Sequence, residues 1–250
     1  MRLAVLQAPS PAGDGVSALA QTGAALRAAG AMGATALVVP EVWLPGYNFD
    51  AIPVAAQEAG AWLDQAAALC RDAGCGLVLG YAEPDGGHLY NATVVFDATG
   101  AQVAHYRKLQ LYGPRERSLY TPGDAYTVFD LGGVKAAILI CYDIEFAPHV
   151  AALAAMGVTL ILVPTANMHP FTHVVRHTVP AMAANHGVSI AYANYCGSEG
   201  DLTYVGGSQI TGPHGETLAM AGGGPALLIA DLPARDPARA STQSTDFRKV

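Results

Sequence analysis

The chain has 250 residues, 52% of them apolar and only 13% charged, with a formal net charge of −7. This acidic balance argues against nucleic-acid binding, which needs a basic face, and the length fits one large α/β domain over residues 1–250. Cysteines occur at four irregular positions, which do not suggest a disulfide framework. We therefore expect a reducing, cytoplasmic location.

No segment of the sequence predicts a membrane anchor or a targeting signal. The apolar run at residues 3–6 is too short for a signal core. Residues 146–175 contain no Asp, Glu, Lys or Arg, but proline and glycine divide them into pieces well below the ~20 residues that a membrane span requires. We expect this stretch to form a helix over 147–157 and a buried strand over 158–163.

The pattern of apolar and alanine-rich runs predicts an α/β protein. Helices between some strands and tight turns between others indicate two mixed sheets with helices outside, rather than one purely parallel sheet. The tail, residues 234–250, is expected to cross to a partner subunit or to be partly disordered. Strands are predicted at 2–6, 36–40, 76–81, 92–97, 101–107, 134–140, 158–163, 188–194, 204–211 and 216–220, and helices at 15–32, 56–73, 147–157 and 174–186.

Reactive side chains follow three of these predicted strands. Glu41 follows 36–40, Lys108 follows 101–107, and Cys141 follows the uncharged run 136–140. Each residue alone has an ordinary alternative, because a buried Cys is most often a small hydrophobe and a Glu or Lys at a strand end is usually solvated. Together they supply a carboxylate, an ammonium and a thiol, which suffice for base-assisted nucleophilic attack on a carbon.

The segments around these residues resemble the nitrilase-like carbon–nitrogen hydrolases. The resemblance rests on Pro40-Glu41 with Leu44-Pro45-Gly46-Tyr47, on Tyr106-Arg107-Lys108-Leu109-Gln110-Leu111, and on Cys141-Tyr142-Asp143-Ile144-Glu145-Phe146. Their order and intervals also match, and the likeness extends over roughly residues 1–232. It implies a four-layer α–β–β–α sandwich, usually dimerised through helices, so we expect a homodimer or a higher homo-oligomer.

The resemblance also implies roles for the catalytic residues. Cys141 is the nucleophile, Glu41 the general base, and Lys108 an oxyanion donor together with the backbone N–H of Tyr142. A second glutamate, Glu116, would fix the lysine and border the substrate, although a surface cluster with its flanking arginines is the alternative. The expected reaction cleaves a small non-peptide amide to an acid and ammonia through a thioester, with no cofactor and no metal.

Substrate class is less determined. Cys141-Tyr142-Asp143 favours an amide over a nitrile, and Arg176 is the only candidate cation found for the carboxylate of an N-carbamoyl substrate. A nitrilase, an N-carbamoyl amidohydrolase and a non-catalytic relative that acts by partner binding stay open as alternatives. The residues expected around the acyl group are Trp43, Tyr47, Tyr112, Asn167 and Tyr195, with Tyr142 beside the nucleophile.

One pattern points to different chemistry. His169, His173 and His177 recur every four residues, a spacing that can place zinc ligands on one helical face. No glutamate accompanies them, and Pro170 limits the helix before His173. A polar or interface face of a helix beginning near Pro170 is therefore the favoured interpretation.

Overall fold

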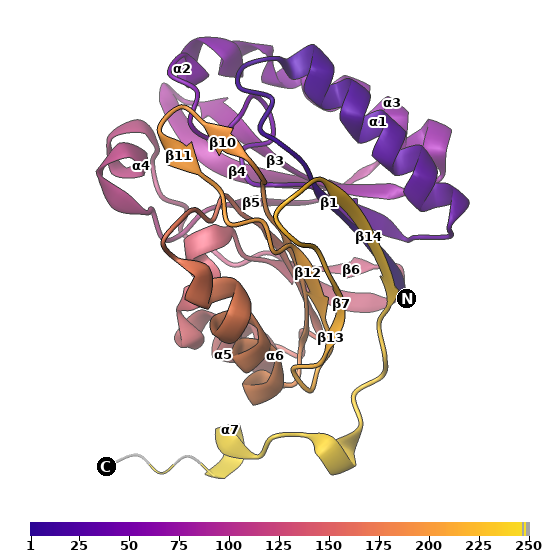
Figure 1. The fold of residues 1–250 in the computed structure, drawn as a ribbon. Coiled ribbons are helices and arrows are strands. Elements are labelled where there is room, and N and C mark those ends of the chain that lie inside the picture. Colours follow the sequence, from indigo (N-terminus) through magenta and orange to yellow (C-terminus); the bar gives the residue numbers. More distant parts are fainter. Residues whose placement is uncertain (247, 249–250) are drawn as a thin grey trace.

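Two mixed sheets stacked face to face organise the computed structural model, which describes residues 1–246 and 248 (Figure 1). Helices cover the outer face of each sheet, so the predicted α–β–β–α sandwich is confirmed. The first sheet pairs three parallel strands with antiparallel strands on both sides. In spatial order its strands are β14 (Ala226–Asp231), β1 (Arg2–Gln7), β2 (Ala36–Val38), β3 (Gly76–Asp85), β4 (His88–Phe96) and β5 (Gln102–Arg107).

The second sheet repeats this plan with a parallel centre and antiparallel edges. A short hairpin of β10 (Ser198–Glu199) and β11 (Leu202–Thr203) lies outside both sheets. In spatial order the strands of the second sheet are β13 (Thr217–Met220), β12 (Gln209–Thr211), β9 (Ser189–Ala193), β8 (Leu160–Pro164), β7 (Val134–Ile138) and β6 (Val128–Leu131).

The long helices lie on the outside of the sandwich. In Figure 1, α1 and α3 cover the first sheet, and α5 and α6 cover the second. The helical segments are α1 (Gly15–Ala31), α2 (Ile52–Ala55), η1 (Ala56–Glu58), α3 (Ala59–Ala73), α4 (Gly113–Leu119), η2 (Cys141–Glu145), α5 (Ala147–Ala155), η3 (Val174–Thr178), α6 (Val179–His186), η4 (Pro237–Arg239) and α7 (Gln243–Asp246).

Alternation along the strands of the first sheet produces the layers. Leu3 and Val5 of β1 point into the core shared with the second sheet, whereas Ala4 points to the core beneath α1 and α3. All three side chains are fully buried. A strand places successive side chains on opposite faces, so a run that is apolar throughout is covered on both sides. The low charge content of the chain is thus accounted for by two cores.

Several elements differ from the sequence prediction. The strand expected over 204–211 is limited to β12, because Gly206 and Gly207 both adopt φ of +67°, which breaks an extended strand. Strands β6 and β14 and helix α4 were not predicted. The helix expected over 174–186 begins with a widened π turn at Val174–Thr178. That turn ends just before Pro180, which has no N–H to continue the helical bonding.

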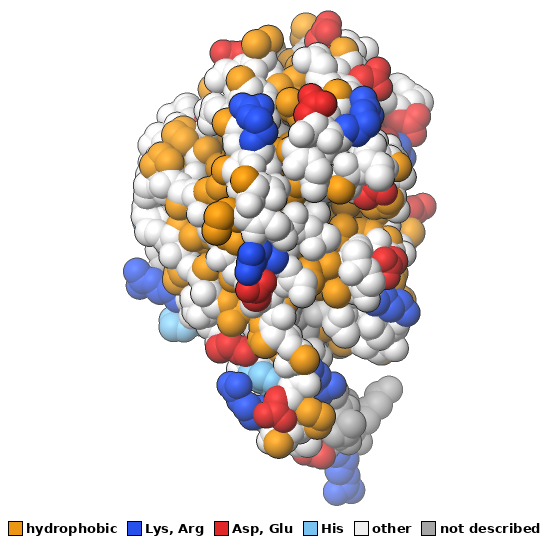
Figure 2. All heavy atoms as spheres, turned by 90° about the vertical axis from the view of Figure 1, so that its right-hand side faces the viewer, with side chains coloured by type: hydrophobic (Ala, Val, Ile, Leu, Met, Phe, Trp, Pro, Cys, Tyr) orange, Lys and Arg blue, Asp and Glu red, His pale blue; other side chains and the backbone are white. Residues whose placement is uncertain are grey.

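The surface carries little charge. The face in Figure 2 shows scattered charged side chains with hydrophobic side chains between them. Within the described residues, no helix is both long enough and apolar enough to cross a membrane. The segment after β14 runs below α5 and α6 in Figure 1 and stays bonded to the rest of the molecule, since the Asp236 N–H donates to His214 Nε2 at 3.0 Å. Part of the predicted tail, at positions 247 and 249–250, lies outside the described residues.

Candidate active site

Three distant regions of the sequence bring the predicted catalytic side chains together, and Lys108 and Glu116 belong to the same region. Glu41 follows β2, Lys108 follows β5, and Cys141 follows β7 at the start of η2. Glu116 lies in α4, a helix that the sequence pattern did not predict. Pro114 near its start and the short length of this helix explain why no helical periodicity was visible in the sequence.

Glu41 is fully buried, and its turn rests directly on β3. Its Oε1 accepts hydrogen bonds from Lys108 Nζ at 2.6 Å and from Asn91 Nδ2 at 2.7 Å. Its Oε2 has no partner among the described residues. A Cβ at Gly80 of β3 would lie 2.5 Å from the Pro40 carbonyl oxygen, so glycine permits this close approach.

Burial raises the pKa of Glu41 to about 7. The positive charge of Lys108 acts in the opposite direction, and the negative charge of Glu116 adds to the increase. A carboxyl group that titrates near neutral pH is suited to accept and return a proton in one reaction cycle. The free Oε2 is the atom available for that transfer.

Lys108 lies between two carboxylates. Its Nζ donates to Glu41 Oε1 at 2.6 Å and to Glu116 Oε1 at 2.8 Å, and its side chain is fully buried. Burial lowers the pKa of Lys108, but the negative charges of Glu116 and Glu41 outweigh this effect and raise it well above the usual value. The ammonium therefore stays charged in the interior, where a fixed cation stabilises negative charge better than it would in water.

Glu116 holds this arrangement in place. Besides the bond from Lys108, its carboxylate accepts hydrogen bonds from the Tyr47 hydroxyl at 2.6 Å and from the backbone N–H of Tyr112 at 2.8 Å. Only 1% of the residue is exposed. These contacts differ from those of a solvated surface cluster, the alternative that its arginine neighbours suggested. Glu116 also connects the lysine to Tyr47 and Tyr112, two residues that line the cavity described below.

Cys141 occupies an unusual backbone position. Its φ is +47°, in the left-handed region that residues other than glycine seldom adopt. This geometry turns the chain sharply out of β7 and into η2. Burial raises the pKa of the Cys141 thiol well above its ordinary value, and the negative charge of Glu41 adds to the increase. Because the thiol is protonated near neutral pH, attack through its sulfur requires a base.

Asp143 fixes the turn that carries Cys141. Its carboxylate accepts the Tyr106 hydroxyl at 2.7 Å, the Gln110 N–H at 2.7 Å and the Ile140 N–H at 2.9 Å. These contacts join the cysteine segment to the lysine segment. The Asp of the Cys-Tyr-Asp motif therefore has a structural function that the sequence alone did not reveal.

A cavity of about 220 Å³ opens beside Cys141. Four residues predicted to contact the substrate line it: Tyr47, Tyr112, Tyr142 and Asn167. Trp43 and Tyr195 do not line it; they stack on each other in the core with ring centroids 5.8 Å apart. Tyr195 instead donates from its hydroxyl to the Glu41 carbonyl oxygen at 2.8 Å, and so supports the backbone of Glu41.

Other cavity residues were not identified from the sequence. Glu145, Met168, Phe171 and His173 complete the lining. Glu145 could have been found, since it lies four positions after the nucleophile within the same motif. The other three lie between β8 and the π turn, where irregular backbone gives no periodic signal.

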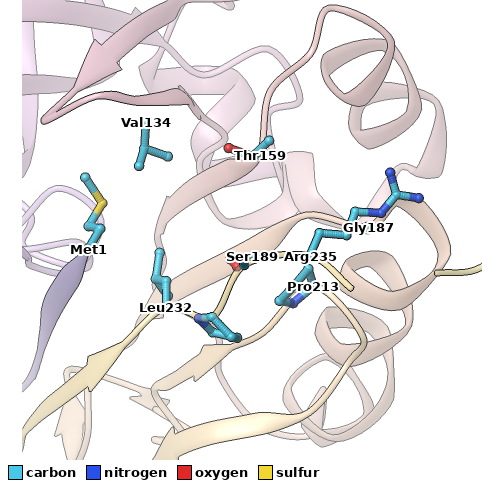
Figure 3. Close-up of a pocket in the computed structure, with 10 residues that line it drawn as sticks. Met1, Val134, Thr159, Gly187, Ser189, Pro213, Leu232 and Arg235 are labelled. Carbon is cyan, nitrogen blue, oxygen red and sulfur yellow. The ribbon is translucent and has the colours of Figure 1, made fainter. Parts of the chain in front are cut away.

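A second cavity, of about 350 Å³, is not lined by Glu41, Lys108 or Cys141 and lies where the start of β1 and the segment after β14 meet the second sheet (Figure 3). Its lining includes Met1, Thr159, Ser189, Leu232 and Arg235. None of the described cysteines or carboxylates lines it, so it lacks the thiol and the carboxylate of the predicted chemistry. The cavity beside Cys141 is therefore the candidate active site.

The three histidines do not converge. His169, His173 and His177 are all exposed, and no group of three His, Cys, Asp or Glu side chains within the described part of the chain could hold a metal ion. The helix in this region begins after Pro170, as expected from the sequence. Arg176 is also exposed and does not line the active-site cavity.

Comparison with known proteins agrees with this geometry. The family model for carbon–nitrogen hydrolases matches residues 2–240. The chain belongs to this family. It is a hydrolase that acts on carbon–nitrogen bonds other than peptide bonds, and its homologues support amide hydrolysis.

Two relatives and one solved structure illustrate the likeness. A hydrolase of the pqqF 5′ region of Pseudomonas protegens is 41% identical over 78% of this chain and 70% of its own length. An (R)-stereoselective amidase from Pseudomonas sp. is 33% identical over 85% and 78%. The amidase of Nesterenkonia sp. AN1 superimposes with a TM-score of 0.91 at 36% identity, covering 99% of this chain and 96% of that one.

Proposed function

We propose that this enzyme hydrolyses a small primary amide to a carboxylic acid and ammonia through a thioester on Cys141. The observation that carries the proposal is the buried Glu41–Lys108–Glu116 arrangement beside a cavity lined by Cys141. It combines a nucleophile, a base with a free oxygen and a fixed cation, which together are suited to acyl transfer.

In the acylation half of the proposed reaction, Glu41 Oε2 accepts the proton of the Cys141 thiol while Sγ attacks the amide carbon. The carbonyl oxygen becomes an oxyanion, and the Lys108 ammonium and the Tyr142 N–H stabilise it. The tetrahedral intermediate then collapses as its C–N bond breaks. Protonated Glu41 returns the proton to the departing nitrogen, so ammonia leaves and the acyl group stays on sulfur.

Water completes the cycle. Glu41, again ionised, removes a proton from a water molecule that attacks the thioester carbon. The C–S bond breaks, the proton returns to sulfur, and the acid is released. A pKa of about 7 for Glu41 suits both directions of this transfer near neutral pH.

Cavity size and lining support a short acyl group. A volume of about 220 Å³ is below the range typical of sites for drug-sized ligands. The family relatives include an amidase from Pseudomonas sp., and the Nesterenkonia amidase has been solved with butyramide. Exposed Arg176 does not line the cavity, which gives no support to the N-carbamoyl alternative.

The test is ammonia release by the purified protein from short amides, nitriles and N-carbamoyl acids, with intact mass measured during turnover. Amide turnover and a mass increase equal to the acyl group are expected, and Cys141→Ala should abolish both. Cys70→Ala is the matched control, because Cys70 is a buried free cysteine in α3. Amide turnover by Cys141→Ala, or turnover of nitriles alone, would overturn the proposal.

We also infer that the chain forms a homo-oligomer in the cytoplasm. Helix α5 has no charged residue, and Met156 just after it is 47% exposed, which supports burial of this face against a second copy. All four cysteines are free, which supports a reducing compartment. Light scattering on the purified protein tests the first inference, and a monomer at micromolar concentration would refute it.

A further inference from the structure

Glu145 lies in the active-site cavity close to the nucleophile. It is the last residue of η2, the 3₁₀ turn that begins at Cys141, and both residues line the cavity. A 3₁₀ helix rises about 2 Å per residue, so the two Cα atoms lie on the order of 8 Å apart along the turn. Two residues this close along one turn, and lining one cavity, can contact the same short substrate.

Among residues 1–246 and 248, the carboxylate of Glu145 makes neither a hydrogen bond nor an ion pair, whereas Glu41, Glu116 and Asp143 all accept hydrogen bonds. Burial raises the pKa of Glu145, and the charges of His173 and Lys108 act against this increase. A partly buried anion without a partner is unfavourable, and a cation bound in the cavity would compensate its charge.

The remaining lining also suits a cation. Tyr112 meets Tyr142 edge to face with ring centroids 5.3 Å apart, and Phe171 at 5.8 Å. These rings form one aromatic wall, and aromatic faces attract ammonium groups. Lys108 cannot neutralise Glu145 directly, since two other glutamates bind its ammonium. Carboxylate and aromatic wall together form a site for positive charge.

We propose that Glu145 binds an ammonium group of the substrate, so that the preferred substrates are short amino-acid amides with this group a few bonds from the reacting carbonyl. This inference rests on the proposed amidase function and specifies its substrate class. The same carboxylate repels amides that carry a carboxylate of their own. Neutral amides of equal size enter the cavity but leave Glu145 unpaired.

The experiment compares substrates of equal shape and different charge. β-Alaninamide and butyramide differ by an ammonium in place of a methyl group, as do alaninamide and isobutyramide, and malonamate supplies an anionic amide. Because a hydrogen bond to a charged group contributes about 1.5–3 kcal/mol, kcat/KM should be at least about tenfold higher for the ammonium member of one pair. Most of this difference should lie in KM.

Glu145→Gln should reduce this ammonium-to-neutral ratio at least about tenfold, to near one, and Glu145→Lys should favour malonamate over β-alaninamide. Each ratio is internal to one protein sample, so a partial loss of folded enzyme cancels. The matched control is Glu58→Gln, which removes an exposed carboxylate in η1 and should keep the wild-type ratio. A wild-type ratio near one for both pairs, or an unchanged ratio in Glu145→Gln, overturns the inference. Absence of any amide hydrolysis by wild type would instead refute the proposed function.

Discussion

Replacing Lys108 with Met tests two separate effects of its ammonium: stabilisation of the folded protein and stabilisation of the oxyanion in the proposed reaction. Met is unbranched and of similar length, so the shape is nearly kept while the charge is lost. Two buried carboxylates, Glu41 and Glu116, then lose their common partner at 2.6 and 2.8 Å. Removing one member of a buried ion pair costs about 3–5 kcal/mol, so we expect the free energy of unfolding to fall by that amount at pH 8.

The loss should be smaller at pH 5. Since the pKa of Glu41 is already raised to about 7 in the folded protein, its protonated form stabilises the fold at low pH, and this stability is lost as pH rises. Lys108 lowers the pKa of Glu41, so Lys108→Met raises this pKa further. The variant therefore goes on losing stability up to a higher pH than wild type does, and the two proteins differ more at pH 8 than at pH 5. Urea unfolding of wild type and Lys108→Met, monitored by tryptophan fluorescence at pH 5 and pH 8, measures the difference in free energy of unfolding at each pH.

Activity should respond differently from stability. We expect kcat of Lys108→Met to fall at least ~10²-fold, the usual effect of losing one oxyanion donor. The double variant Lys108→Met/Glu116→Gln removes one of the stranded carboxylates, so it should regain part of the stability without regaining kcat. A loss below about 1 kcal/mol at pH 8, or recovery of amide hydrolysis in the double variant, would refute the reasoning.

Three further outcomes can be measured. Because Glu41 must be ionised to accept a proton, kcat/KM should rise with pH to a plateau above about 7. Glu116→Gln removes a negative charge that raises the pKa of Glu41, so the rise in kcat/KM should occur at lower pH. A rise at the same pH as in wild type would contradict the interaction between the two carboxylates. Cys141→Ala should show no turnover, and activity within tenfold of wild type would remove Cys141 from the mechanism. Its Tm should lie within about 2 °C of wild type, since the change in free energy of unfolding should stay below about 1 kcal/mol. Asp143→Ala leaves the Tyr106 O–H and the Ile140 N–H buried without their acceptor, and the Gln110 N–H partly buried. At ~1–3 kcal/mol for each buried group, the free energy of unfolding should drop by at least about 2 kcal/mol, and a drop under 1 kcal/mol would show that water replaces the carboxylate.

The central strands and the candidate catalytic side chains could be predicted because each depends on a short local pattern. Buried strands such as β8 are continuous apolar runs. Glu41 and Cys141 each follow such a run, and Lys108 follows a run in which polar and apolar residues alternate. Glu116 was expected to fix Lys108 and its carboxylate accepts from that ammonium, but its helix was missed because α4 has only seven residues. Local patterns therefore located the chemistry better than they located the element boundaries.

Features that depend on long-range contacts could not be read from the sequence. Strand β14 is only partly buried along most of its length, and its pairing with β1 requires the completed sheet. Trp43 and Tyr195 were expected at the substrate, yet no residue pattern separates an aromatic in a cavity from one packed behind it. That the Glu145 carboxylate lacks a hydrogen bond or ion pair within the described residues could not be predicted, because this depends on which side chains the fold places around it.

The pairing of β1 with β14 has a consequence for synthesis of the protein. The Arg2 guanidinium of β1 donates a hydrogen bond to the Asp231 carboxylate of β14. These two residues are 229 positions apart along the chain. At a translation rate of 5–20 residues per second, β1 waits on the order of 10–50 s for this neighbour. Until then the strand has an open edge that can pair with other chains. Newly made chains should therefore aggregate most readily while still on the ribosome, and slower translation of the last third should increase the loss.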